Sequence, residues 1–136
     1  MKKYLDLKFS EFTTNKSFNF SRKKILNVLP EKYLLDAYKV ISKWKGYKKT
    51  PLTNLKKLSK KLGTNNIFYK DESKRFNLKS FKALGGAYAV EKIAKNKKKI
   101  TVSTATAGNH GKSVSWGAKN VGANCKIFIS ENVSTT

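Results

Sequence analysis

Lys82 stands among residues whose types and spacing could support amine chemistry. In a helix over residues 81–95, Gly85, Gly86 and Ala89 would share a face with Lys82, because residues three, four and seven positions apart are neighbours. Each glycine costs about 1 kcal/mol relative to alanine in a helix interior. We therefore expect another group to approach the backbone here, either a flat cofactor ring or a tightly packed neighbouring element. A buried lysine with a lowered pKa can form a Schiff base; the alternative is a surface lysine beside an incidental pair of glycines.

A second segment, residues 104–111, combines small and polar residues between a predicted strand and a predicted helix. Ligands bind at this end of the strands in open α/β sheets, and the N–H groups in the first turn of a helix are free to meet an anion. Asn109 offers both a hydrogen-bond donor and an acceptor, and the small residues let a ligand approach the backbone. The alternative is that Gly108 and Asn109 only cap the helix, and that His110 has no role.

The spacing of apolar residues predicts the elements that position these two segments. It favours helices at about 30–44, 52–62, 81–95 and 109–119, and strands at 67–69, 100–103 and 125–129. The order strand, helix, strand, helix, strand predicts an α/β fold, with a parallel sheet and flanking helices. Phe81, Leu84 and Tyr88 would hold the Lys82 helix in the core. We expect residues 1–29 to be an irregular segment and residues 30–136 to form a single, partial domain.

The net charge of +22 comes almost entirely from lysine, because Arg22 and Arg75 are the only arginines. Proteins that read bases or phosphates usually rely on the planar fork of arginine, and here the lysines are spread along the whole chain. This pattern indicates a compositional bias as much as an electrostatic footprint. A basic nucleic-acid-binding module is therefore a distant alternative, since no binding motif accompanies the charge.

Other classes of function are excluded by what the sequence lacks. One cysteine, Cys125, cannot form an intramolecular disulfide, and with one histidine it cannot build a metal cluster. The sequence contains neither a Walker-type loop nor a Gly-x-Gly-x-x-Gly motif. No apolar run is long enough to span a membrane, and the N-terminus has no apolar stretch typical of a signal peptide. We expect no metal, no membrane association and a cytoplasmic location.

Two motifs together resemble those of a known enzyme superfamily. Residues 80–86, SFKALGG, resemble the lysine motif of the fold type II pyridoxal-phosphate (PLP) enzymes, which include serine/threonine dehydratases and tryptophan synthase β. Residues 106–111, TAGNHG, resemble the asparagine loop of the same superfamily. Within it the chain is most similar to the diaminopropionate ammonia-lyases, in residues 70–76 and Trp116 as well as in the two motifs. The resemblance covers about residues 28–130 and implies the N-terminal portion of that architecture.

This resemblance implies a PLP-dependent β-elimination. Lys82 would hold PLP as a Schiff base and would then remove the α-proton of the substrate. With 2,3-diaminopropionate the products would be pyruvate and two molecules of ammonia. Asn109 would hydrogen-bond the phenolic oxygen of the cofactor ring, and Phe81 would lie beside the cofactor. The residues implied at the cofactor are Lys82, Phe81, Asn109, Gly108 and His110, and those implied beside the substrate carboxylate are Ser103, Thr104, Ala105 and Thr106.

The chain also departs from this family in two respects. Ala107 stands where the resemblance places an aspartate that is thought to assist proton transfer, and alanine cannot do this. A serine or threonine dehydratase-like enzyme is therefore the alternative substrate assignment. The glycine-rich loop that cradles the PLP phosphate lies later in the family, beyond residue 136. We therefore expect a truncated chain that is inactive or impaired alone, a remnant, or one completed by a companion polypeptide or a homodimer.

Overall fold

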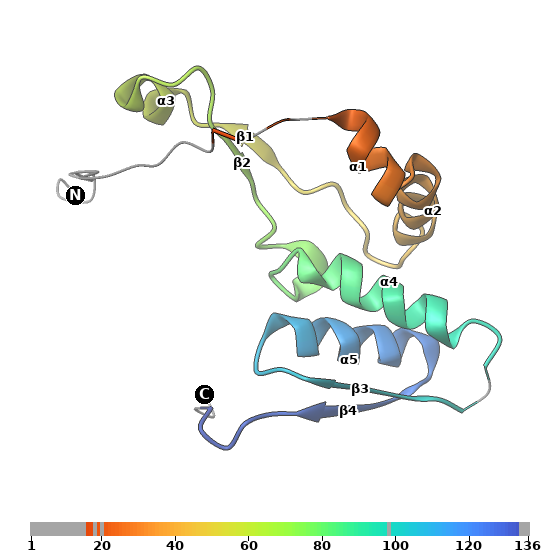
Figure 1. Ribbon diagram of the computed structural model, residues 1–136. Coiled ribbons are helices and arrows are strands. Elements are labelled where there is room, and N and C mark those ends of the chain that lie inside the picture. Colours follow the sequence, from red (N-terminus) through yellow and green to blue (C-terminus); the bar gives the residue numbers. More distant parts are fainter. Residues whose placement is uncertain (1–15, 18, 20, 98, 134–136) are drawn as a thin grey trace.

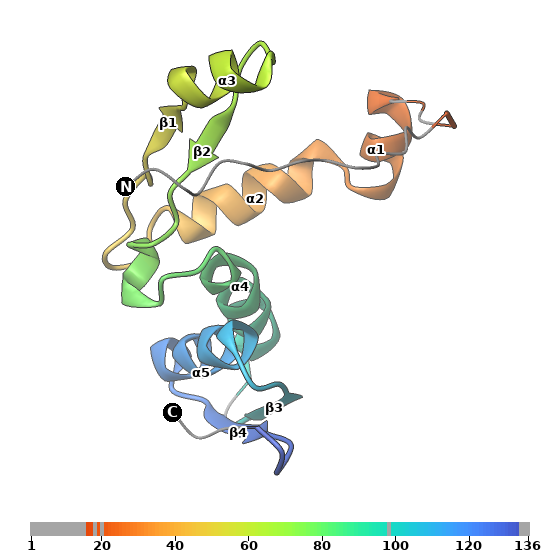
Figure 2. The same ribbon diagram turned by 90° about the vertical axis from the view of Figure 1, so that its left-hand side faces the viewer.

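The fold is built around two helices that pack on a small parallel sheet. A computed structural model describes residues 16, 17, 19, 21–97 and 99–133. Helix α4 (Lys82–Ala94) lies on helix α5 (Asn109–Val121), and α5 covers one face of strands β3 (Thr101–Ala105) and β4 (Asn124–Phe128). Figure 1 shows these three layers, and the view turned by 90° in Figure 2 shows the same order.

Strands β3 and β4 pair in parallel, with Thr101 opposite Asn124 and Ala105 opposite Phe128. A parallel pair needs a crossover connection, and α5 provides it. Gly122, with a φ of 69°, ends α5 in the left-handed conformation that glycine adopts without strain. The carboxyl ends of both strands and the first turns of α4 and α5 consequently lie at one end of this unit (Figure 1).

The core is formed by small residues where α4 and α5 meet. Val90, Val114 and Ala118 are buried together, against partly buried residues of β3, β4 and their connections. A side chain at Gly117 would lie 2.7 Å from the Cα atom of Ala87, so the helices approach too closely for anything larger. The predicted stripe needs correction for this reason: Phe81 is 65% exposed and Leu84 and Tyr88 are only half-buried, whereas Ala83, Ala87 and Val90 are buried.

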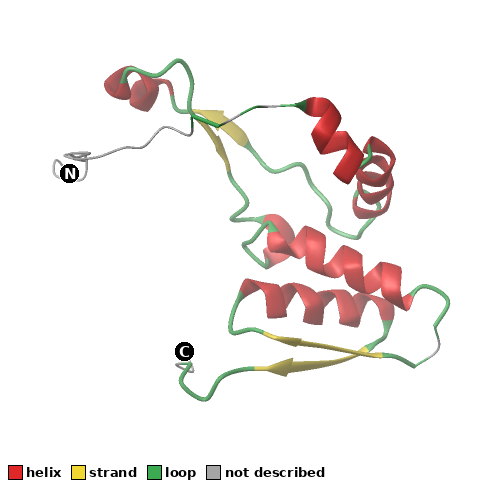
Figure 3. Cartoon of the chain, viewed as in Figure 1, coloured by secondary structure: helices red, strands yellow, loops and turns green. Residues whose placement is uncertain are grey.

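The N-terminal half forms a second group of shorter elements. Helices α1 (Arg22–Val28) and α2 (Glu31–Ile41) are followed by β1 (Leu52–Asn54), α3 (Lys56–Leu62), β2 (Phe68–Lys70) and a 3₁₀ turn at Arg75–Asn77. Of these, α2 contacts α4. Figure 3 shows the two strand pairs as separate yellow arrows. Within the described residues no helix is long and apolar enough to cross a membrane.

Three sequence predictions need correction here. Strand β2 does not join the parallel sheet, because it pairs antiparallel with β1. Leu52 belongs to β1 rather than to the following helix, which begins at Lys56. Helix α1 lies in the segment that we expected to be irregular. Residues 1–15 of that segment lie outside the described residues. The predicted helices at 30–44, 81–95 and 109–119 are confirmed as α2, α4 and α5, with ends shifted by a few residues.

Candidate active site

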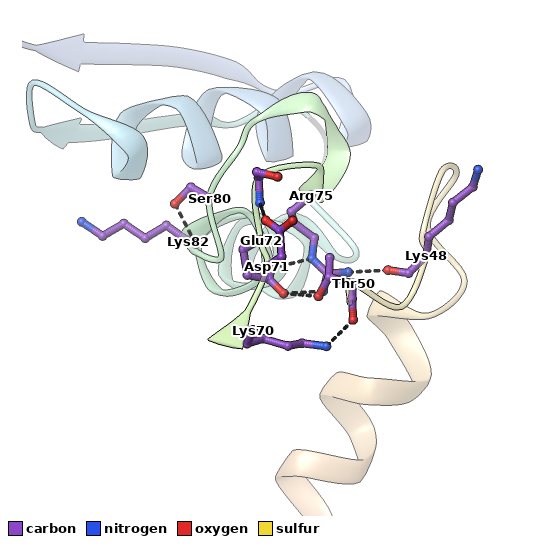
Figure 4. Close-up of polar contacts among 9 residues, drawn as sticks. Lys48, Thr50, Lys70, Asp71, Glu72, Arg75, Ser80 and Lys82 are labelled. Carbon is purple, nitrogen blue, oxygen red and sulfur yellow. Dashed lines mark hydrogen bonds and ion pairs between the residues drawn. The ribbon is translucent and has the colours of Figure 1, made fainter. Parts of the chain in front are cut away.

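Lys82 is the first residue of α4, and its side chain is exposed rather than buried. Its backbone N–H donates to the hydroxyl of Ser80 at 3.2 Å, and its carbonyl accepts from the hydroxyl of Ser113 at 2.6 Å. Within the described part of the chain, no hydrogen bond or ion pair engages its ε-amino group. Figure 4 shows the side chain extending away from the neighbouring polar cluster. The amine is therefore free to react while its backbone is held on both sides.

The two glycines that follow Lys82 have different surroundings. A Cβ atom at Gly85 would meet nothing within 4 Å, so this position borders open space. A Cβ atom at Gly86 would lie 2.3 Å from Ser113 Oγ and 2.9 Å from Ser113 Cβ. The sequence offered a cofactor ring or a neighbouring element as the reason for both glycines. At Gly86 the neighbouring element is the reason, whereas at Gly85 the space beside the helix stays open.

The asparagine loop lies at the start of α5, as the sequence predicted. Asn109 is the first helical residue and Gly108 is the N-cap, and within the described residues no side-chain hydrogen bond caps this end of the helix. The uncapped N–H groups of that turn can therefore meet an anion. Gly108 has an extended backbone, and Thr106 Oγ1 accepts from its N–H at 3.4 Å. Asn109 and His110 are both exposed.

The predicted substrate-contacting residues divide between strand and loop. Ser103, Thr104 and Ala105 belong to β3, with Thr104 half-buried and the other two exposed. Thr106 lies beyond the end of β3. A pocket of about 290 Å³ opens between this loop, the first turns of α5 and the end of β4. Its lining residues are Thr106, Ala107, Gly108, Gly111, Lys112, Ser115, Ile127 and Ile129.

The structure brings the two motifs to the same end of the molecule. Ser113, whose hydroxyl reaches the Lys82 carbonyl, lies four residues after Asn109. Residues four apart share a helix face, so Asn109 lies one turn before the point where α5 contacts Lys82. Phe81, the remaining predicted residue, is exposed beside Lys82. The 290 Å³ pocket, by contrast, is lined by neither Lys82 nor Asn109.

A buried polar cluster, for which no role was predicted, anchors the chain that leads into α4 (Figure 4). Arg75 is only 5% exposed, and it donates to Glu72 through Nε at 2.7 Å and Nη2 at 2.9 Å. Its Nη1 donates to the Lys48 carbonyl at 2.7 Å, and its Nη2 also donates to Thr50 Oγ1 at 2.9 Å. Thr50 in turn donates to Glu72, and Lys70 Nζ donates to the Thr50 carbonyl at 2.6 Å.

The charges of this cluster stabilise one another. The hydrogen bonds from Arg75 lower the pKa of Glu72 from 4.5 to about 2, and burial opposes this effect. The same contact raises the pKa of Arg75. A signal was present in the sequence, because an acid and an arginine three residues apart can form an ion pair. Nothing local, however, indicated that Thr50 and the Lys48 carbonyl would complete the cluster from more than 20 residues away.

Next to this cluster, aromatic rings join the turn after α2, the 3₁₀ turn and α5. Phe76 stacks on Trp116 with ring centroids 4.6 Å apart, and Trp44 meets Trp116 edge-on at 5.5 Å. Trp44 Nε1 donates to Glu91 Oε2 on α4 at 2.5 Å. Phe76 has a φ of 48°, a conformation that costs energy for a bulky residue and persists only when its surroundings hold it. The ring contacts therefore hold the segment before Lys82 against α5, and the Trp44–Glu91 hydrogen bond connects the same rings to α4.

Comparison with known protein families gives one match over most of this region. A sequence model of the family described as pyridoxal-phosphate dependent enzymes matches residues 43–136. These residues include the Thr50–Arg75 cluster, Lys82 and the Asn109 loop.

Individual relatives agree with this match. The diaminopropionate ammonia-lyase of Escherichia coli K12 is 34% identical over 137 residues, which cover 88% of this chain and 34% of the relative. The biosynthetic L-threonine dehydratase of Pasteurella multocida is 39% identical over 84 residues, covering 61% of this chain and 16% of the relative. The chain thus spans about a third of the length of the ammonia-lyases that it matches.

Solved structures show that the arrangement of elements is shared as well. Selenomethionine-containing holo diaminopropionate ammonia-lyase from Escherichia coli superimposes with a TM-score of 0.70 and 35% identity, over 76% of this chain and 31% of that one. The same enzyme in complex with D-serine gives a TM-score of 0.68 and 37% identity, over 73% of this chain and 30% of that one. The mixed α/β architecture of the described residues therefore matches a portion of a known enzyme.

Proposed function

Because this chain belongs to the family of pyridoxal-phosphate dependent enzymes, we propose that Lys82 binds PLP covalently and that the chain serves β-elimination from a small amino acid. The observation that carries this proposal is the state of Lys82. Lys82 is exposed, its amine has no hydrogen-bond or ion-pair partner among the described residues, and its backbone is held at the end of the molecule where α5 begins. A lysine that bonds covalently to a cofactor needs an amine that is free to react and a backbone that is held in place.

The residues around Lys82 suit a flat anionic cofactor. Open space borders the helix at Gly85, so a ring could approach the backbone there. The uncapped first turn of α5 offers N–H donors to anionic groups of the cofactor or the substrate. Asn109, at the start of that turn, has a side chain that can donate to a ring oxygen. These features would accommodate PLP beside Lys82.

When bound, PLP supplies an electron sink for the pair released from the substrate α-carbon. The protein groups of this chain would do the rest. Lys82 Nζ would take the α-proton, and Asn109 would orient the cofactor ring through its phenolic oxygen. The backbone and hydroxyl groups of residues 103–106 would bind the substrate carboxylate. Gly108 and His110 would border the cofactor on the same loop.

For the substrate, we propose 2,3-diaminopropionate, which would yield pyruvate and two molecules of ammonia. Support comes from the Escherichia coli K12 ammonia-lyase, whose match covers 88% of the chain, whereas the match to the Pasteurella multocida threonine dehydratase covers 61%. One position supports the second candidate, a serine or threonine dehydratase-like reaction. Ala107 is exposed beside the 290 Å³ pocket and has no group that can move a proton, although the resemblance places an aspartate there.

The cofactor role is tested by incubating the chain with PLP, reducing it with borohydride and mapping the modified peptides by mass spectrometry. We expect one dominant modified residue, Lys82, and loss of that product in Lys82→Ala. Lys112→Ala is the matched control, because Lys112 is also exposed and also lies near the start of α5. Equal labelling of many lysines in all three proteins would contradict the proposal.

The substrate is tested by measuring ammonia release in the presence of PLP from 2,3-diaminopropionate, serine and threonine. The fastest release from diaminopropionate supports the lyase. Faster release from serine or threonine supports the dehydratase candidate instead. Release from none of the three would show that this chain does not catalyse the reaction by itself.

A further inference from the structure

A hydroxyl group from α5 holds the backbone of the proposed cofactor lysine. Ser113 is completely buried, and its Oγ donates to the Lys82 carbonyl at 2.6 Å across the helix interface. The contact joins residues 31 positions apart in the sequence. A buried hydroxyl without a partner costs free energy, so the geometry that satisfies Ser113 also fixes where the first turn of α4 sits relative to α5.

Gly86 is the residue that admits this contact. A side chain at position 86 would place its Cβ atom 2.3 Å from Ser113 Oγ, closer than any tolerated contact. The two glycines after Lys82 therefore have different roles, because Gly86 makes room for Ser113 whereas Gly85 borders open space. The helix propensity lost at Gly86 is offset by the inter-helix hydrogen bond and by the close packing of α4 on α5.

A second serine hydroxyl binds the other polar backbone group of Lys82, its N–H. Ser80, which is also buried, accepts from the Lys82 backbone N–H at 3.2 Å. The first N–H groups of a helix have no partner within the helix, so Ser80 satisfies one of them. Both polar backbone groups of Lys82 are consequently bound by serine hydroxyls from separate segments, while its amine has no partner in the part of the chain that the structure describes.

We propose that Ser113 is a positioning residue. Its hydrogen bond to the Lys82 carbonyl, for which Gly86 leaves room, sets where the Lys82 side chain leaves the backbone relative to Asn109. Asn109 lies one turn before Ser113 on α5. This inference rests on the proposed PLP function of Lys82. It assigns to the buried Ser113–Gly86 contact a specific effect on covalent cofactor binding, beyond its contribution to packing. Loss of the Ser113–Lys82 hydrogen bond should lower the fraction of Lys82 that is labelled by PLP more than it lowers the fraction of protein that is folded.

The test compares wild type with Ser113→Ala, Gly86→Ala and the control Ser59→Ala. Ser59 is an equally suitable buried serine, because its Oγ donates to the Leu55 carbonyl at 3.1 Å and accepts from the Ile67 N–H at 3.0 Å, away from Lys82. For each protein, PLP is titrated, trapped with borohydride and quantified at Lys82 and at Lys112. Urea unfolding of the same samples gives the folded fraction under the labelling conditions.

We expect Ser113→Ala and Gly86→Ala to need about fivefold more PLP for half-maximal labelling of Lys82, on the order of one buried hydrogen bond. Labelling at Lys112 should not change, and Ser59→Ala should label Lys82 as wild type does. Unchanged labelling of Lys82 in Ser113→Ala would overturn the inference, and so would an equal loss in Ser59→Ala. Failure of the proposed function would be seen separately, as absence of preferential Lys82 labelling in wild type.

Discussion

Replacement of Glu72 by glutamine should make the stability of this chain far less sensitive to acid. In the folded protein the Arg75 hydrogen bonds lower the pKa of Glu72 from 4.5 to about 2. Because the folded pKa is the lower one, the stabilisation is fully present above pH 4.5 and is lost as the pH falls towards 2. A shift of this size corresponds to about 3 kcal/mol at most. The Glu72 side chain is 16% exposed, so solvent screening reduces our expectation to about 2 kcal/mol.

The assay is urea unfolding at pH 7, 5 and 3, followed by the fluorescence of Trp44 and Trp116, which lie beside the cluster. At pH 7 we expect Glu72→Gln to be about 2 kcal/mol less stable than wild type, because Arg75 stays buried without its counter-ion. The difference should shrink as the pH falls below 4.5. Glu31→Gln is the control, since Glu31 is exposed on α2. A difference that stays constant or grows on acidification would refute the proposed role of the ion pair.

Two substitutions of glycine should have opposite effects on stability. Gly117→Ala should destabilise the fold by about 1–3 kcal/mol, because the new methyl group would lie 2.7 Å from the Ala87 Cα atom and the helices would have to separate; thermal unfolding without this loss would contradict the packing described. Gly85→Ala should raise stability by up to about 1 kcal/mol, because it improves helix propensity in open space. The same change should reduce PLP labelling at Lys82 if the cofactor ring uses that space, and undiminished labelling would place the ring elsewhere.

Much of the element order could be predicted from the sequence because it depends on local patterns. The apolar spacing predicted a helix at 81–95 and another at 109–119, which correspond to α4 and α5. The Asn109 loop was placed correctly at a strand-to-helix turn. The family was also predicted from two short motifs, because Lys82 and Asn109 each carry a distinctive set of neighbours along the chain. The roles of the individual site residues remain predictions that the labelling experiments test.

Several of the errors share one physical cause, since they depended on a partner distant in the sequence. The apolar stripe of Phe81, Leu84 and Tyr88 was predicted to hold α4 in the core, but Phe81 is exposed and the close approach of α5 buries the residues at 83, 87 and 90 instead. Strand β2 was assigned to the parallel sheet because strand order suggested it, whereas its partner is β1. For Lys82 the sequence left both a buried and a surface position open; the residue is exposed, and Ser113 of α5 hydrogen-bonds to its backbone carbonyl.

The sequence by itself therefore determined that α2, α4 and α5 form and which two segments carry the family's motifs, since propensity and spacing act within a few residues. Only the tertiary structure decided which face of α4 is buried and which glycine makes room for Ser113. It also decided how Thr50, Glu72 and Arg75 combine into one cluster. Those outcomes follow from packing and hydrogen bonding between residues about 20 to 30 positions apart in the sequence. No local pattern encodes which distant residue will make each contact.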